Sequence, residues 1–482
     1  MKKIILLLIL FLGFLVRLYK VNAPLADWHS WRQADTAAVA RNFVKYGYDL
    51  LHPRFDDLSN IPSGKDNPQG YRFVEFPIFN FIHAFLYQLI NKLIQGVSFE
   101  MVGRMVSIFS SLGAAIFLYL IVKENLGRWL ALLSMTVFLF LPYSIYYSRT
   151  ILPEPMMVML ALGSVCFLRK FQISNSKSRI FLSILFGASS ILVKPYAIFL
   201  LAPSWLVIFG SGFKKAGRKS LDTRYSILYT LISISPFLVW RWWMRQFPEG
   251  IPANRWLLNL GGIRFRPAWW RWLFAERLAK LILGYWGLIP LGIGLITKTG
   301  KKGSENLFYS WLGGIFAYLV IFARGNVQHD YYQIIALPAI SVFVAKGVEF
   351  LLVAPKKYFY PVLPLALCFL SLLFSFGFSW YHVREYYKIN RPEIVEVGKL
   401  ADKILPKEAR VIAPYNGDTA FLYQINRRGW PAMTYDLQRM KALGATHYVS
   451  VDFDQLTNEL KQQCSVLNQT DKGIIISLEN CQ

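Results

Sequence analysis

Residues 27–42 read DWHSWRQADTAAVARN, and this polar stretch follows an apolar segment at the start of the chain. The apolar segment, Met1–Val21, begins with two lysines and is long enough to cross a bilayer. No small-x-small cleavage site follows it and many more apolar segments do, so we expect a retained membrane span. A carboxylate, Asp35, on an amphipathic helix just after such a span indicates chemistry at the membrane surface on a lipid-borne substrate.

The composition is that of a helical membrane protein. The chain has 482 residues, of which 55% are hydrophobic and only 17% are charged, and this leaves too little polar surface to coat a soluble globule of that size. The formal net charge of +25 does not indicate nucleic-acid binding, because the Lys and Arg residues form short clusters between apolar runs. Membrane topology explains that distribution better.

The apolar runs predict an all-α polytopic membrane protein with about eleven transmembrane helices. The candidate spans are 4–21, 101–122, 129–147, 155–168, 180–193, 196–210, 225–243, 278–296, 307–323, 332–353 and 359–380. Segment 77–95 is also apolar, but counting it as a span would place almost every basic cluster outside, against the positive-inside bias. We therefore expect 77–95 to lie along the outer interface as a helix.

The same charge bias predicts a cytoplasmic N-terminus and an extracytoplasmic C-terminal domain. Basic clusters such as 214–219, 301–302 and 356–357 fall in the loops assigned to the cytoplasm. The long loops 22–100 and 244–277 then lie outside. Arginines and tryptophans alternate in 244–277, a mixture typical of anchoring at the lipid headgroups, although guanidinium groups also suit a lipid phosphate.

The C-terminal residues predict a small α/β module, which divides the chain into a transmembrane catalytic domain, 1–380, and a soluble domain, 381–482. The predicted elements are helices near 392–404, 419–424, 437–443 and 453–462 and strands near 410–414, 447–451 and 473–478. Cys464 and Cys481 both fall in this module, and an extracytoplasmic location would allow a disulfide between them. Cys166 and Cys368 lie in apolar runs and are interpreted as buried structural thiols.

Two acids in the first outer loop are candidates for chemistry, because ionisable groups near membrane depth are costly. Asp35 opens the predicted helix 35–45, where an N-cap role is the structural alternative. Glu75 stands in an aromatic setting, RFVEFP, just before the interfacial segment, and capping is again the alternative.

The other candidates fall in short outer turns between spans. Glu154 lies between two prolines, with a solvated loop acid as the alternative, and Lys194 interrupts an apolar hairpin, where it would pair with a phosphate or with one of the acids. The turn 324–332 reads RGNVQHDYY and contains many hydrogen-bond donors and acceptors. We expect this turn to contribute Arg324, His329, Tyr331 and Tyr332 to a site.

In this order and on one membrane face, these motifs resemble the GT-C membrane glycosyltransferases. The likeness covers roughly residues 1–380 and is closest to the bacterial branch of glycosyltransferase family 39, related to protein O-mannosyltransferases and the aminoarabinose transferases of lipid A. The motifs that carry it are WRQADTA at 31–37, EFP at 75–77, SRT at 148–150 with Glu154, KP at 194–195, HDYY at 329–332 and LP at 337–338.

The resemblance implies transfer of a sugar from a polyprenyl-phosphate donor to a protein, lipid or glycan hydroxyl on the outer face of a bacterial or archaeal cytoplasmic membrane. It also implies a catalytic carboxylate in the first outer loop. Arg32-Gln33 stands where the family has an Asp-Glu pair, so Asp35, one helical turn further on, becomes the candidate base and Asp27 the reserve. Phe76 replaces a lysine of the lipid A branch, which disfavours an aminoarabinose substrate.

In the predicted inverting mechanism, Asp35 takes the proton of the acceptor hydroxyl. Lys194, Arg324, Arg149 and His329 stabilise the departing phosphate, and Glu75 and Glu154 position hydroxyl groups. Two carboxylates are also compatible with a divalent ion, although no dense His/Asp set supports one. The rival hypotheses are a transporter or lipid flippase, which would carry charges near the midplane of related halves, and a non-catalytic receptor built on the C-terminal module.

Overall fold

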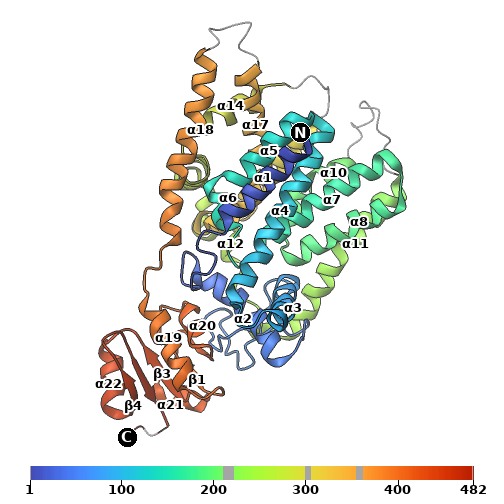
Figure 1. Cartoon of the computed structure of the whole chain (residues 1–482). Helices are drawn as coiled ribbons and strands as arrows, with labels where there is room; N and C mark the ends of the chain where they lie inside the picture. The colour runs from blue at the N-terminus through green and yellow to red at the C-terminus, as the bar shows by residue number, and fades with distance from the viewer. Residues whose placement is uncertain (1, 210–221, 299–304, 354–361, 480, 482) are drawn as a thin grey trace. The chain divides into compact units, whose positions relative to one another are not determined.

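The computed structural model describes residues 2–209, 222–298, 305–353, 362–479 and 481. It is mostly helical, with one small sheet near the C-terminus (Figure 1). The chain divides into two compact units: unit 1 comprises Met1–Val21, Arg104–Trp240 and Asn254–Tyr386, and unit 2 comprises Asn22–Gly103, Arg241–Ala253 and Tyr387–Gln482. Residues 22–103 group with the C-terminal module in unit 2, while the predicted division at residue 380 stays a prediction. The basic clusters 214–219, 301–302 and 356–357 lie outside the described residues.

Unit 1 is built from helices, three of which run a few residues past its bounds. Its longer members are α1 (Lys2–Arg17), α4 (Phe99–Leu126), α5 (Arg128–Phe140), α7 (Glu154–Ser174), α8 (Lys177–Val193), α11 (Thr223–Trp243), the π-helix η5 (Arg271–Ile282), α15 (Asn306–Ile321), α17 (Leu337–Val353) and α18 (Val362–Val383). Its shorter members are α6 (Pro142–Tyr147), α9 (Ala197–Leu200), α10 (Ala202–Phe209), α12 (Trp256–Asn259), η4 (Leu260–Phe265), α13 (Pro267–Trp270), α14 (Leu288–Ile296), α16 (Ala323–Gln328), η6 (Asp330–Ala336) and η8 (Arg384–Tyr387).

Four helical segments of the described residues are long and apolar enough to cross a membrane: Phe99–Leu126, Glu154–Ser174, Asp330–Val353 and Val362–Tyr387. The predicted count of eleven spans is therefore not confirmed. Several predicted runs are interrupted: 129–147 becomes α5 and α6, which Pro142 separates, and 196–210 becomes α9 and α10. A proline removes a backbone donor and clashes with the preceding turn, so an apolar run that contains one need not form one helix.

The centre of unit 1 lies around α17. In the segment Asp330–Val353, 83% of the apolar window is buried, against 28% in Val362–Tyr387, so the first is an internal helix and the second presents most of its apolar surface outward. Two glycines allow α14 to approach α17 closely. A Cβ on Gly294 would collide with the carbonyl of Phe343, and one on Gly347 with the carbonyl of Pro290. Small residues at such contacts are the usual means of close helix packing in membranes.

Unit 2 combines the loop segment Asn22–Gly103 with the α/β module. The loop forms α2 (Ser30–Tyr46) and α3 (Ile78–Leu93), and residues 241–253 add the short helices η2 (Met244–Gln246) and η3 (Pro248–Gly250). The helix predicted at 77–95 is thus present as α3, while its position relative to the membrane stays a prediction. The five-stranded sheet has the order β2-β1-β3-β5-β4, with β1 parallel to β2 and β3, and β5 antiparallel to β3 and β4.

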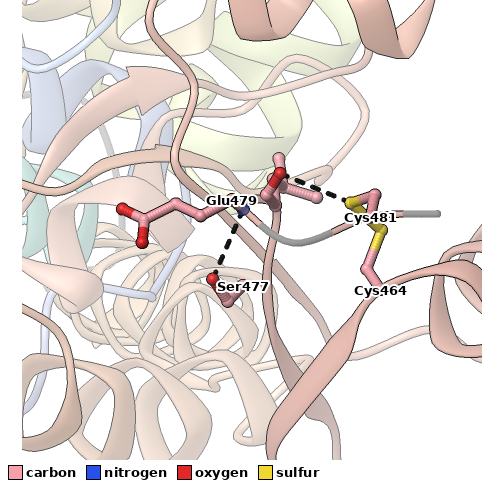
Figure 2. The surroundings of a disulfide bond; sticks show 5 residues. Cys464, Ser477, Glu479 and Cys481 are labelled. Carbon is pink, nitrogen blue, oxygen red and sulfur yellow. Dashed lines mark hydrogen bonds between the residues drawn. A yellow bond between two sulfur atoms is a disulfide. The ribbon is translucent and has the colours of Figure 1, made fainter.

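All seven predicted elements of the C-terminal module are present. The helices are α19 (Glu393–Ile404), α20 (Ala420–Ile425), α21 (Leu437–Ala442) and α22 (Gln455–Gln463), and the strands are β1 (Arg410–Ile412), β2 (Arg428–Trp430), β3 (His447–Ser450), β4 (Ser465–Gln469) and β5 (Ile474–Ser477). The prediction missed β2, which is three residues long, and β4, an edge strand with an exposed, mostly polar sequence. Figure 2 shows the disulfide between Cys464 and Cys481, near Ser477 and Glu479.

Candidate functional site

Helix α2 positions the candidate base. The helix begins at Ser30, directly after His29, whose φ of 56° is left-handed. Asp35 therefore lies in the second turn, and the alternative that it serves as an N-cap is wrong. The alanines at 34, 37, 38 and 40 are at most 2% exposed, and their small side chains allow neighbouring segments to pack closely on this helix. Asp35 itself is only 3% exposed.

Two residues distant in sequence hold the Asp35 carboxylate. An Arg72 Nη lies 2.6 Å from Asp35 Oδ2, and the Thr419 hydroxyl donates to Asp35 Oδ1 at 2.8 Å. The Arg72 guanidinium also stacks on the Phe55 ring, 4.9 Å from its centroid. Both oxygens of Asp35 are thus engaged, one by a charged donor and one by a neutral donor.

A narrow pocket joins Asp35 to the second predicted acid of this loop. Its walls include Glu75, whose Oε1 lies 2.5 Å from an Arg32 Nη. The pocket lining is Arg32, Asp35, Thr36, Val39, Pro53, Arg72, Val74, Glu75, Pro77 and Asn80. The capping alternative for Glu75 is not supported, because α3 begins after Pro77 without a side-chain cap. Two carboxylates and two guanidinium groups therefore share one small pocket.

Burial dominates the electrostatics around Asp35. It raises the pKa of the Asp35 carboxyl above its ordinary value, while Arg72, Arg32 and the Thr419 hydroxyl partly oppose that rise. Burial also raises the pKa of Asp57 to about 7 and that of Asp418 to about 6, and the neighbouring Asp35 charge adds to both. Carboxyl groups with raised pKa values suit proton transfer near neutral pH.

The reserve candidate, Asp27, lies outside this pocket. Its Oδ1 accepts a hydrogen bond from the Gln33 amide at 2.8 Å, and Asp27 is not among the residues that line the pocket. In the part of the chain that the structure describes, no three His, Cys, Asp or Glu residues are grouped so as to hold a metal ion.

Glu154 and Lys194 meet in unit 1. Glu154 is the first residue of α7, Lys194 directly follows α8, and Lys194 Nζ lies 3.1 Å from Glu154 Oε1. The exposed fractions of the two side chains are 5% for Lys194 and 3% for Glu154, so the alternative of a solvated loop acid is wrong. Of the two roles considered for Lys194, pairing with an acid is therefore present in this structure.

The turn 324–332 contributes an aromatic cluster. The rings of His329, Tyr331 and Tyr332 lie within 5.5 Å of one another, and the Tyr196 hydroxyl donates to the Tyr332 hydroxyl at 3.2 Å. Arg324, in α16 of the same turn, is partly exposed. Tyr196 brings this cluster close to the segment that carries Lys194.

Arg149 lies inside the helix packing of unit 1. Its guanidinium donates to the Lys20 carbonyl at 3.2 Å and stacks over the Tyr146 ring, and the side chain is fully buried. The tryptophans of the Arg/Trp segment divide between interior and surface. Trp269 is 1% exposed, whereas Trp270 and Trp272 are 53% and 41% exposed.

Sequence reasoning missed Arg72, Thr419 and a role for Asp330. Asp330 is 1% exposed and accepts hydrogen bonds from the hydroxyls of Tyr147 and Tyr386 at 2.5 and 2.6 Å. The Tyr143 hydroxyl donates to its backbone carbonyl at 2.6 Å. Asp330 thereby connects α6, η6 and η8. The only available signal was the density of tyrosines in 143–147 and 386–387, whose pairing with Asp330 no spacing rule predicts.

An open apolar groove follows the Lys194 segment in unit 1. Its volume is about 450 Å³, and its lining comes from α9, α10, α11 and α15: Ile198, Phe199, Ala202, Trp205, Thr230, Ile234 and Gly314. Among these, Thr230 carries a hydroxyl and Trp205 an indole N–H, and that N–H donates to the Ile198 carbonyl at 2.9 Å. An apolar chain would bind here through dispersion and surface burial.

Known proteins share this architecture. Residues 77–240 match the family model described as dolichyl-phosphate-mannose-protein mannosyltransferase, while no curated protein sequence matches the chain. The crystal structure of ArnT from Cupriavidus metallidurans bound to undecaprenyl phosphate is similar, with a TM-score of 0.67, 12% identity and coverage of 98% of both chains.

Two further structures share the fold. The archaeal oligosaccharyltransferase AglB from Archaeoglobus fulgidus, in complex with an inhibitory peptide and a dolichol-phosphate, gives a TM-score of 0.58 at 10% identity, covering 99% of this chain and 74% of AglB. The arabinofuranosyltransferase AftD from Mycobacteria gives 0.57 at 12% identity, covering 99% of this chain and 41% of AftD. The predicted resemblance is confirmed: this chain shares the fold of these GT-C membrane glycosyltransferases, and residues 77–240 match the family model.

Proposed function

We propose that this protein transfers a sugar from a polyprenyl-phosphate donor to a protein, lipid or glycan hydroxyl on the extracytoplasmic face, with inversion at the anomeric carbon. The observation that carries the proposal is the Asp35 pocket, because a buried carboxylate with a raised pKa beside Glu75 fits a general base. The fold supports the donor class: ArnT and AglB were crystallised or solved with undecaprenyl phosphate and dolichol-phosphate.

In the proposed reaction, the acceptor hydroxyl attacks the anomeric carbon as Asp35 takes its proton. The new bond joins the acceptor oxygen to that carbon, and the bond from the carbon to the phosphate oxygen breaks. The polyprenyl phosphate leaves with the electron pair. Glu75 and Glu154 position hydroxyl groups, and the phosphate is stabilised by donors drawn from Lys194, Arg324, His329, Tyr331, Tyr332 and Arg149.

One feature of unit 1 supports an isoprenoid donor. The apolar groove begins four residues after Lys194, so a cation able to meet a phosphate lies next to a surface able to hold a hydrocarbon tail. The disulfide between Cys464 and Cys481 supports an extracytoplasmic C-terminal module, since disulfides persist in oxidising compartments. The eleven-span topology with a cytoplasmic N-terminus is part of the same proposal.

The test is sugar release from donors of known structure. Purified protein in liposomes is incubated with undecaprenyl-phosphate hexoses and pentoses, and mass spectrometry follows the loss of each sugar. We expect Asp35→Asn to lower turnover at least ~100-fold, the usual scale for a lost general base, while Asp27→Asn, which also removes a buried acid, keeps it. If Asp27→Asn abolishes turnover and Asp35→Asn does not, Asp27 is the base.

The same liposomes also test the flippase alternative. A transporter would move a fluorescent undecaprenyl-phosphate sugar between leaflets without releasing the sugar. Donor translocation by both the wild-type protein and Asp35→Asn, with no sugar release by either, would replace the transferase proposal with transport.

A further inference from the structure

The loop that precedes α20 in the C-terminal module reaches the candidate base on α2. In unit 2, the Thr419 hydroxyl donates to Asp35 Oδ1 at 2.8 Å, although the two residues are 384 positions apart in the chain. The same hydroxyl lies 3.2 Å from the Trp31 carbonyl. A threonine hydroxyl has one proton, and the shorter contact to the charged acceptor is the stronger of the two.

The usual local role of a threonine at this position does not explain that geometry. Thr419 is the N-cap of α20, where a threonine side chain ordinarily bonds a free backbone amide, yet it makes no side-chain cap. The neighbouring Asp418 accepts from the Ala420 amide at 2.7 Å instead. The Thr419 hydroxyl is thereby released from helix capping and points to Asp35.

The surrounding contacts hold Thr419 firmly against α2. The Ser30 hydroxyl donates to Asp418 at 3.1 Å, Arg41 donates to the Tyr423 carbonyl at 2.9 Å, and Gln424 donates to the Leu25 carbonyl at 3.0 Å. The loop before Thr419 is also fixed on its other side, because the amides at 415 and 417 donate to the Pro431 carbonyl. Thr419 is only 7% exposed. These hydrogen bonds therefore fix the position of the Thr419 hydroxyl.

We infer that Thr419 is a positioning residue of the proposed transfer reaction: its hydroxyl orients and stabilises the ionised Asp35 carboxylate, so the C-terminal module completes the site on α2. This inference rests on the proposed role of Asp35 as the base. It gives the C-terminal module a part in catalysis, in place of a separate binding function. Asp418 contributes from the same loop, as a partly buried acid that repels charge on Asp35.

The charged groups around Asp35 determine in which direction each substitution moves its pKa. Arg72 and Arg32 favour the ionised form, whereas the acids at 56, 57 and 418 disfavour it. The Thr419 hydroxyl adds to the first group, because it donates to the carboxylate. Removing it raises the pKa of Asp35, and removing the charge of Asp418 lowers it.

The experiment measures the pH profile of kcat/KM for sugar release from the best undecaprenyl-phosphate donor of the panel, with the full-length protein in liposomes. Thr419→Val is expected to move the acid limb up by about one pH unit, the equivalent of one hydrogen bond to a charged group, and so to lower turnover about tenfold on the acid side. Thr419→Ser restores the wild-type profile. Asp418→Asn, which keeps an acceptor for the Ala420 amide, moves the limb down.

Controls separate this inference from general destabilisation and from failure of the base assignment. Thr457→Val removes another buried hydroxyl of the same module, bonded to Tyr448 at 2.8 Å, and is expected to leave the profile unchanged. A Thr419→Val profile that coincides with wild type, or a Thr457→Val profile that shifts equally, overturns the inference. Full turnover by Asp35→Asn overturns the base assignment itself. If Thr419→Val fails to fold, Asp418→Asn still decides: a downward shift of its acid limb supports the inference, and no shift overturns it.

Discussion

The buried ion pair between Lys194 and Glu154 gives the sharpest test of the proposed donor site. The charged atoms are 3.1 Å apart and both side chains are almost fully buried. At an effective dielectric constant of about 20, their attraction is ~5 kcal/mol, and desolvation of the two ions offsets part of it. We expect Lys194→Met alone to cost about 3–5 kcal/mol, because it leaves the Glu154 charge buried without its partner.

A double-mutant cycle separates stability from function. Lys194→Met with Glu154→Gln removes both charges, and we expect it to recover about 3 kcal/mol relative to the sum of the single variants. Reversible unfolding in mixed detergent micelles measures the four free energies. Sugar release from the undecaprenyl-phosphate panel measures function, and there the double variant is expected to stay at least ~100-fold below wild type, because the phosphate loses a cation.

A second ion pair in unit 1, between a buried lysine and a partly exposed glutamate, supplies the control. Lys346 Nζ lies 3.0 Å from Glu305 Oε1, and Lys346 is 2% exposed, yet neither residue belongs to the candidate site. Lys346→Met with Glu305→Gln should show a similar coupling energy and unchanged turnover. Wild-type turnover in the Lys194/Glu154 double variant would refute the donor role of Lys194, and a coupling energy under about 1 kcal/mol would refute the energetic argument.

Two further predictions concern stability. Tyr386→Phe removes a hydrogen bond to the buried Asp330 carboxylate and should lower the free energy of unfolding by about 1.5–3 kcal/mol. The same micelle assay measures this loss. A loss under about 0.5 kcal/mol would mean that Asp330 does not need this donor. Replacing both Cys464 and Cys481 by serine opens a loop with a sequence separation of 17 residues. On the chain-entropy model this should destabilise the module by about 3 kcal/mol. We expect faster hydrogen exchange of the backbone amides in β3 and β5. Unchanged exchange there would show that the sheet holds without the disulfide.

The sequence predicted the helical class, the C-terminal elements and the two acidic positions of the pocket, because each leaves a local signal. The C-terminal helices and strands carry clear periodicity, and Asp35 and Glu75 are acids in surroundings where acids are costly. The spans were harder to predict, since an apolar window does not distinguish one helix from two helices that meet at a proline. The breaks at Pro142 and between α9 and α10 show this directly.

The partners of the acids could not be predicted, because each comes from a distant part of the chain. Arg72 and Thr419 contact Asp35 from 37 and 384 positions away, and neither position carries a motif that points to α2. The electrostatic character of Asp35 depends on them: burial raises the pKa of its carboxyl, and the guanidinium and the hydroxyl beside it partly oppose that rise. A base is therefore defined by its neighbours as much as by its own side chain. For that reason, substitutions at Thr419 and Asp418 test the proposed mechanism more finely than removal of Asp35, since they change the proton affinity of the carboxylate and leave the carboxylate in place.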